Sequence, residues 1–165
     1  LYAASIGAKK VYAFEPVNST FESLKRHIYL NKMQDKIVPI RKALGEQKRK
    51  AHITLGYEGD PGASIIENLE KSGRCEEIEV VTIDEFFNGE QIDLIKMDTE
   101  GFEEKVMLGA KKTISKFKPV ISMSAYHKPH DSESLPITLK GIDGGYVCEL
   151  IHRDELDLYC HCTDR

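Results

Sequence analysis

Short apolar runs alternate with amphipathic helical patterns along most of the chain. The runs at 10–16, 92–97 and 118–126 have the length and apolar content of buried strands, and each is followed by a segment with helical periodicity. Two further strand patterns, 145–153 and 155–162, lie next to each other near the end. This order predicts an α/β fold with a mostly parallel sheet flanked by helices, closed by an antiparallel C-terminal strand.

The chain opens with a segment, 1–6, that is typical of the tail of a helix capped by Gly7. A length of 165 residues fits a single domain, 1–165. Sheets that bind nucleosides begin with a strand and a glycine-rich loop, and neither is found in this sequence. We therefore expect the first strand and the glycine loop to precede Leu1, which makes the domain incomplete at its N-terminus.

Residues 45–79 differ in character from the rest of the chain. They contain two strand patterns on either side of a loop rich in turn-forming residues, 57–64. Specificity commonly resides on loops above a rigid sheet. We therefore interpret 45–79 as an insert on the substrate side, with Ser64 as a candidate substrate-binding residue.

Composition excludes several classes of partner. A net charge of −4 and a pI near 5.9 argue against nucleic acid, because no basic excess exists to neutralise phosphates. No apolar run approaches the length of a membrane-spanning helix, so we expect no membrane partner. The spacing of the four cysteines does not match a disulfide scaffold and favours a reducing cytoplasm; they are Cys75, Cys148, Cys160 and Cys162.

Acidic residues follow two of the predicted strands. Ligands of parallel sheets bind at the carboxyl ends of the strands, where an acid can accept hydrogen bonds from ribose hydroxyls. Glu15 fits that role, and its alternative is to interact with the N-terminus of the next helix. Asp98 and Glu100 follow the run 92–97. Helix capping explains one acid there but not two, so we interpret them as a ligand-facing pair with Gly101 permitting close backbone approach.

Tyr126 and His127 follow the run 118–126. A histidine titrates near neutral pH and can act as a base or as an orienting group, although a loop histidine without a role is the plain alternative. The Cys160–Cys162 segment, CHC, places both cysteines on one face of a strand and His161 on the other. This geometry argues against a metal site and for small buried apolar side chains.

Several segments together resemble the FkbM-type methyltransferases, a class I group dependent on S-adenosylmethionine. The resemblance rests on VYAFEPVNSTFESLKRHIYLN, on VTIDEF and above all on IDLIKMDTEGFEEKVMLGAKKTISKFKPVI at 92–121. It covers nearly the whole chain, from about Val11 to Cys162. The family's first strand and its glycine loop have no counterpart here.

The resemblance implies a Rossmann-like fold and S-adenosylmethionine as cofactor, bound by Glu15 with Pro16, by Ala43 and by Asp98. It implies methylation of a hydroxyl on a small molecule or sugar. Catalytic candidates are Asp98, Glu100 and His127, of which any could be the base, and Tyr126 is a candidate substrate contact. No metal ligand is assigned: two acids could hold a Mg²⁺ ion, but an octahedral site usually needs more ligands than the sequence identifies, so metal dependence is left open.

Two other functions fit parts of the sequence. A nicotinamide-dependent oxidoreductase shares the role of Glu15 but leaves the DTEGFE segment unexplained. A non-catalytic Rossmann-like domain that binds a nucleoside or a partner fits the absent first strand, because a fold alone does not establish an activity. The identity of the acceptor and the oligomeric state are left open by the sequence.

Overall fold

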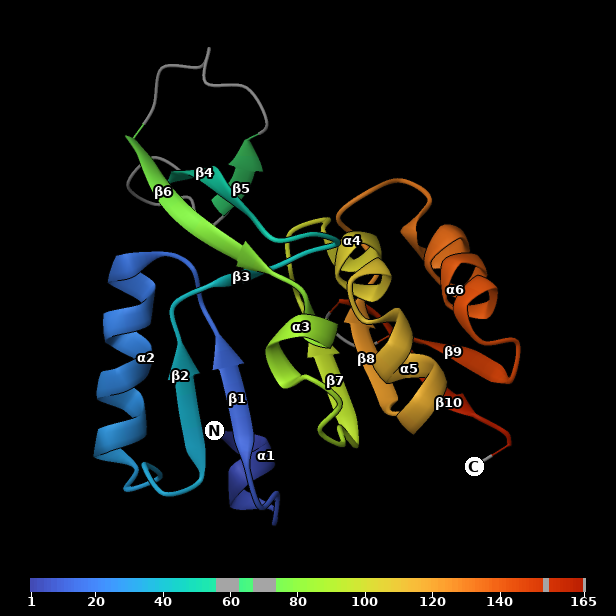
Figure 1. Cartoon of the computed structure of the whole chain (residues 1–165), viewed down its shortest axis with the longest axis horizontal. Coiled ribbons are helices and arrows are strands. Elements are labelled where there is room, and N and C mark those ends of the chain that lie inside the picture. Colours follow the sequence, from blue (N-terminus) through green and yellow to red (C-terminus); the bar gives the residue numbers. More distant parts are fainter. Residues whose placement is uncertain (56–62, 67–73, 153–154, 165) are drawn as a thin grey trace. The chain divides into compact units, whose positions relative to one another are not determined.

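The computed structural model describes residues 1–55, 63–66, 74–152 and 155–164. The chain divides into two compact units (Figure 1). The first unit is formed by Leu1–Ala43 with Arg49–Val80, and the second by Leu44–Lys48 with Val81–Arg165. The described residues form both helices and strands, and the strands pair in parallel as well as antiparallel, so the predicted α/β class is confirmed.

The first unit begins with a strand–helix–strand arrangement. Strands β1 (Val11–Phe14) and β2 (Ile37–Ile40) pair in parallel, with helix α2 (Asn18–Leu30) between them in sequence and the short α1 (Tyr2–Ser5) before them. Gly7 has a φ of +117°, which suits the expected end of α1. The elements enclose a small core of Ala4, Ile28 and Ile37, against which Val11, Ala13, Leu24 and Met33 pack.

The predicted insert forms a sheet of its own, ordered β3-β6-β4-β5. Strand β4 (Arg49–Leu55) pairs antiparallel with both β5 (Ala63–Ile66) and β6 (Arg74–Val81), and β3 is Ala43–Leu44. Sequence patterns predicted β4 and β6 but not β5, because Ala63 and Ser64 were assigned to a turn-rich loop. Most of that loop, 57–62, lies outside the described residues. The buried side chains here are Val17, Ala43, Ala51, Ile53, Ile78 and Val80.

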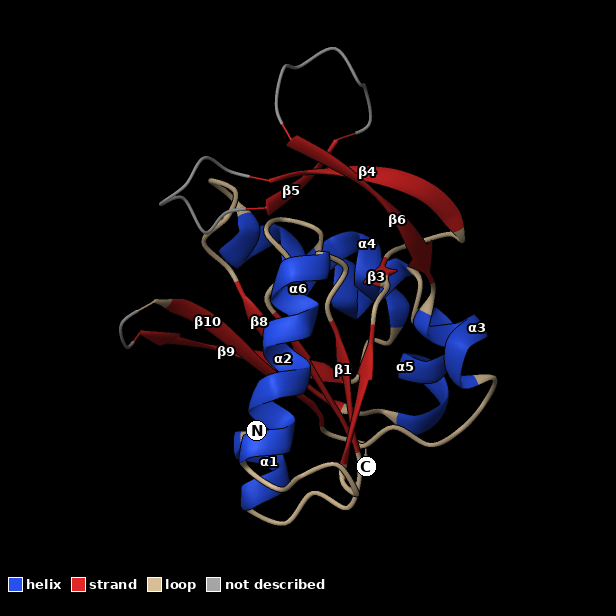
Figure 2. Cartoon of the chain, turned by 90° about the vertical axis from the view of Figure 1, so that its left-hand side faces the viewer, coloured by secondary structure: helices blue, strands red, loops and turns tan. Residues whose placement is uncertain are grey.

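The second unit is built on a four-stranded sheet ordered β7-β8-β10-β9. Its strands are β7 (Leu94–Met97), β8 (Val120–Ser124), β9 (Tyr146–His152) and β10 (Leu156–Cys162). Its helices are α3 (Ile83–Phe87), α4 (Glu103–Leu108), α5 (Lys111–Phe117) and α6 (Asp131–Ile142). Helix α4 packs against α5 and α6 (Figure 2). Thr138 Oγ1 of α6 donates a hydrogen bond to Glu104 Oε1 of α4 at 3.1 Å.

The strand directions correct the prediction of one mostly parallel sheet. The described strands form three sheets; β1 pairs in parallel with β2 and β7 with β8, whereas β4 pairs antiparallel with β5 and β6. Strand β10 runs antiparallel to β8 and β9, as predicted for the closing hairpin. Strand β7 is not buried on both faces, since Leu94 is 54% exposed while Ile95 and Met97 are buried. The Rossmann-like arrangement and the single domain stay predictions.

The helical periodicity that follows the run 92–97 predicts one helix over 102–116, and the structure breaks it at Gly109 and Ala110 into α4 and α5. A Cβ atom on Gly109 would lie 2.0 Å from the Gly45 carbonyl oxygen, so the chain approaches too closely for any side chain. The Asp84 carboxylate then accepts hydrogen bonds from the N–H groups of Lys112 and Thr113. These bonds cap α5, a role for which periodicity along the helix gave no signal.

The cysteine prediction is partly wrong. Cys148 and Cys160 face each other across β9 and β10 and form a disulfide, because antiparallel register brings their side chains to the same face. The spacing of twelve residues signals nothing until the hairpin is known. Cys160 and Cys162 are both buried, as the alternation predicted, and the disulfide removes the support that cysteine spacing lent to a reducing compartment.

Candidate functional site

The carboxyl ends of β7 and β8 lie side by side in the second unit. The parallel register pairs Met97 with Met123, so the residues that follow the two strands emerge at the same edge. Asp98 comes directly after β7 and His127 follows β8. Nε2 of His127 lies 3.0 Å from Oδ1 of Asp98. Two of the three predicted catalytic residues are therefore in direct contact.

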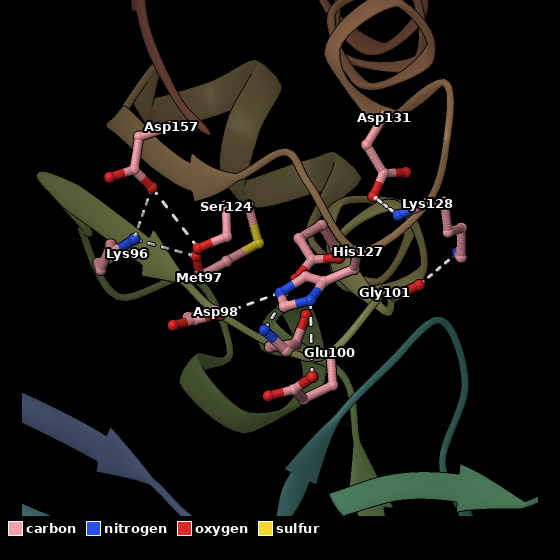
Figure 3. A network of polar contacts seen from close by, with 12 residues as sticks. Lys96, Met97, Asp98, Glu100, Gly101, Ser124, His127, Lys128, Asp131 and Asp157 are labelled. Carbon is pink, nitrogen blue, oxygen red and sulfur yellow. Dashed lines mark hydrogen bonds and ion pairs between the residues drawn. The ribbon is translucent and has the colours of Figure 1, made fainter. Parts of the chain in front are cut away.

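The His127 ring lies among three carboxylates (Figure 3). Besides Asp98, Glu100 Oε2 lies 3.5 Å from Nδ1 and Glu103 Oε1 lies 3.6 Å from Nε2. The ring is 9% exposed, whereas the side chains of Asp98 and Glu100 are 51% and 48% exposed. The imidazole is thus the buried centre of the cluster, and two of its carboxylates face solvent.

Glu103 is a member of the cluster that the catalytic prediction left out. Its side chain is 1% exposed, and Oε1 accepts a 2.8 Å hydrogen bond from the Thr99 N–H. From the sequence, Glu103 is only one residue of the segment 92–121 that carries the resemblance, because a glutamate in a first helical turn is ordinary. The sequence signal that could have identified Glu103 is its spacing of four residues from Thr99, about one helical turn. We call Asp98, Glu100, Glu103 and His127 the carboxylate–imidazole cluster.

The loop after β7 has an unusual backbone. Glu100 and Gly101 have φ values of +53° and +88°, a region that favours glycine and costs energy for glutamate. Lys128 Nζ donates to the Gly101 carbonyl, and the Lys128 N–H donates to Oδ2 of the buried Asp131 at 2.7 Å. A Cβ on Gly101 would lie 3.1 Å from Lys128 Cε. These contacts fix the conformation that presents Glu100.

Tyr126 lies beside the cluster, with its ring centroid 4.3 Å from that of His127. Desolvation of the phenol, a hydrogen bond with Glu155 and the charge of Asp98 raise the pKa of Tyr126 to about 12. The hydroxyl therefore remains protonated at neutral pH and is a hydrogen-bond donor rather than a base. The side chain is 39% exposed, so a substrate can reach it.

Three of the four predicted cofactor residues, Glu15, Pro16 and Ala43, belong to the first unit, and the fourth, Asp98, belongs to the second. Glu15 follows β1, and its Oε1 accepts a 2.8 Å hydrogen bond from the N–H of Val17, the N-cap residue of α2. Burial raises the pKa of Glu15, the Val17 bond lowers it, and the charge of Glu76 raises it. The alternative of an acid at a helix start is therefore present in the contacts. The Ser19–Glu22 spacing predicts a capping box with Ser19 as the N-cap, and this prediction is wrong, since Val17 is the N-cap and Ser19 lies inside α2.

The other predicted contacts in this unit are spread over several elements. Pro16 follows Glu15 in the connection to α2, and Ala43 is buried in β3. Ser64 lies in β5 and pairs with Thr54 of β4.

Among the described ranges, no helix is both long and apolar enough to cross a membrane.

Comparison with known proteins decides the family. Residues 1–152 match the model of the Methyltransferase FkbM domain. The chain belongs to the FkbM methyltransferase family. This confirms the resemblance carried by the segment from Asp98 to Ala110.

A solved FkbM structure shows the same fold. The crystal structure of Methyltransferase FkbM from Methylobacillus flagellatus KT aligns with a TM-score of 0.72 and 22% identity. The alignment covers 93% of this chain and 36% of the other, so the FkbM chain described here spans about a third of that protein's length. No curated protein matches the sequence.

Proposed function

We propose that this FkbM-family chain takes part in methyl transfer from S-adenosylmethionine to a hydroxyl of a small molecule or sugar. The observation that carries the proposal is the carboxylate–imidazole cluster at the carboxyl ends of two parallel strands, in a chain of a methyltransferase family. Ligands of α/β sheets bind at these ends. The family name alone would support transfer without indicating which residues carry it.

Glu15 is the residue that fits the ribose of the cofactor. Its Oε1 is anchored by the Val17 N–H, which fixes the carboxylate and leaves Oε2 to accept from a ribose hydroxyl. Pro16 and Ala43 would shape the adjoining surface, and Asp98 remains a second candidate contact. S-adenosylmethionine supplies an electrophilic methyl group when it is bound. What the protein must add is alignment of the acceptor oxygen and a place for its proton.

Glu100 is the member of the cluster best placed to take that proton. It is half exposed and therefore reachable, while His127 is almost buried. With cofactor and acceptor bound, the acceptor oxygen would bond to the methyl carbon as the bond from that carbon to sulfur breaks, and Glu100 would take the hydroxyl proton. His127 steadies Glu100 through Nδ1 and is itself held by Asp98. Tyr126 donates a hydrogen bond to the acceptor, and Ser64 is the candidate contact from the insert.

The test is transfer of a labelled methyl group from S-adenosylmethionine to a panel of small hydroxyl compounds and sugars, using the natural full-length protein. We expect label in at least one acceptor and loss of labelling in Glu100→Gln. The matched control is Glu104→Gln, an exposed carboxylate on the same helix as Glu103 whose contact is Thr138. Equal labelling by all three proteins would contradict the role of the cluster.

A further inference from the structure

The carboxylate–imidazole cluster contains a set of atoms that matches a divalent cation. Single oxygen or nitrogen atoms of Asp98, Glu103 and His127 all lie within 4.8 Å of one another. The His127 Nε2 atom is 3.0 Å from the Asp98 oxygen and 3.6 Å from the Glu103 oxygen. Ligands about 2.1 Å from one ion are separated from each other by about 3.0–3.5 Å. The two measured separations are close to that range.

Burial gives a reason for a cation that is independent of these distances. Glu103 is 1% exposed, and a buried carboxylate is costly unless it is paired or coordinates a metal. Its described partners are the Thr99 N–H and the His127 ring, which is neutral in one of its two protonation states. Thr99 Oγ1, in the same loop, is buried without a hydrogen-bond partner among the described residues. A cation bound beside Glu103 would supply a positive charge next to this buried carboxylate.

The second nitrogen of the imidazole is arranged as in metal sites. A histidine that binds a metal usually donates its other N–H to a carboxylate, which fixes the ring and its tautomer. Glu100 Oε2 lies 3.5 Å from Nδ1, on the side of the ring away from the Nε2 contacts. Nε2 is thereby left for the ion. The half-exposed Asp98 keeps one side of the site open to solvent and to an acceptor.

We infer that Asp98, Glu103 and His127 bind a divalent transition-metal ion, with Glu100 beside the Nδ1 atom of His127. A site of one imidazole and two carboxylates suits Mn²⁺ or Zn²⁺, whereas Mg²⁺ prefers a site made of oxygen ligands alone. The role of the ion rests on the proposed methyl transfer: a carboxylate such as Glu100 is a weak base for an alcohol, and a bound cation acidifies the acceptor hydroxyl. The hydroxyl proton still passes to Glu100, so the transfer stays balanced.

The test measures Mn²⁺ alone, by electron paramagnetic resonance and calorimetry on the natural full-length protein without cofactor or acceptor. We expect one bound Mn²⁺ per chain, and a loss of affinity of at least about tenfold in Asp98→Asn and in Glu103→Gln. Asp98 is half exposed, so its variant should fold even if replacement of the buried Glu103 disturbs packing. Glu104→Gln, a carboxyl-to-amide change next to Glu103, should bind Mn²⁺ as the wild type does.

Two outcomes overturn the cation site: no stoichiometric Mn²⁺ binding, or binding that Asp98→Asn leaves unchanged. Methyl transfer is assayed separately with and without chelator. Stoichiometric Mn²⁺ binding without any transfer would support the site and contradict the proposed function. Chelator-resistant transfer by a protein that binds no Mn²⁺ would support the function and overturn the site.

Discussion

The ends of β1 and β7 both carry acidic residues that the sequence marked as ligand-facing, but their surroundings differ. Glu15, after β1, is half-buried and tied to the N–H of Val17 at the start of the next helix. Asp98, after β7, contacts the ring of His127, which follows β8. Glu100 and Glu103 contact the same ring. A single anchored acid suits binding, whereas several groups converging on one imidazole suit proton transfer.

The difference teaches that position at a strand end does not fix the role of an acid. The helix-capping alternative is realised in part at Glu15, which satisfies one of the free N–H groups at the start of α2. At the second strand end, Glu103 accepts the hydrogen bond from the Thr99 N–H, and Asp98 contacts His127 instead. The neighbouring strand therefore decides which acids are left for chemistry.

The largest expected effect comes from removing the charge of Glu100. Glu100→Gln keeps the shape of the side chain but cannot take a proton, and we expect kcat of methyl transfer to fall by about 10²–10³-fold. Cofactor affinity should change little. Initial rates at saturating cofactor measure this, with Glu104→Gln as the control. A rise in the KM for the acceptor with kcat intact would assign Glu100 to binding and remove the contrast between the two strand ends.

The corresponding change at the other strand end is Glu15→Gln. Loss of a charged hydrogen bond to a ribose hydroxyl is worth about 1.5–3 kcal/mol, so we expect cofactor affinity to fall by about 10–100-fold with the folded state retained. Calorimetry with S-adenosylhomocysteine measures it. Glu22→Gln is a suitable control, because Glu22 is an exposed acid of α2 whose partner is Lys25. Equal losses in the two variants would point to surface charge rather than to a ribose contact.

The pH dependence of cofactor affinity should reflect the ionisation of Glu15. The charged carboxylate is the form that accepts from ribose hydroxyls, and burial raises its pKa above the ordinary value for glutamate. As the solution is acidified, affinity should therefore decline at a higher pH than ordinary glutamate titration would give. Glu15→Gln should remove this decline. A decline that persists in the variant would assign the titration to another group.

The smallest expected effect is on stability, from Gly101→Ala in the loop that presents Glu100. The residue has a φ of +88°, and the added methyl would lie 3.1 Å from Lys128 Cε. Adopting this conformation without glycine costs about 1–2 kcal/mol of the free energy of unfolding. Urea unfolding measures it. Gly144→Ala is the control, because its φ is not left-handed and its Cβ would meet nothing within 4 Å. Equal losses would show that the loop is not specially constrained.

Sequence patterns predicted the strands on either side of the cluster and placed Asp98, Glu100 and His127 at strand ends. They could do so because buried strands and helical periods are local properties of the chain. Glu103 and Lys128 were not predicted as site residues, since their roles depend on the register of β7 with β8 and on a left-handed turn. The break at Gly109 and the Cys148–Cys160 bond were missed for the same reason: each depends on a residue distant in sequence.

The central claim is that the end of β1 binds the cofactor and the end of β7 carries the chemistry. Calorimetric titration of the natural full-length protein with S-adenosylhomocysteine, comparing wild type, Glu15→Gln and Glu100→Gln, tests it most directly. The account predicts binding to the wild type, affinity weakened at least about tenfold in Glu15→Gln, and affinity within about threefold of wild type in Glu100→Gln. Wild-type protein that does not bind, or a larger loss in Glu100→Gln than in Glu15→Gln, would contradict it.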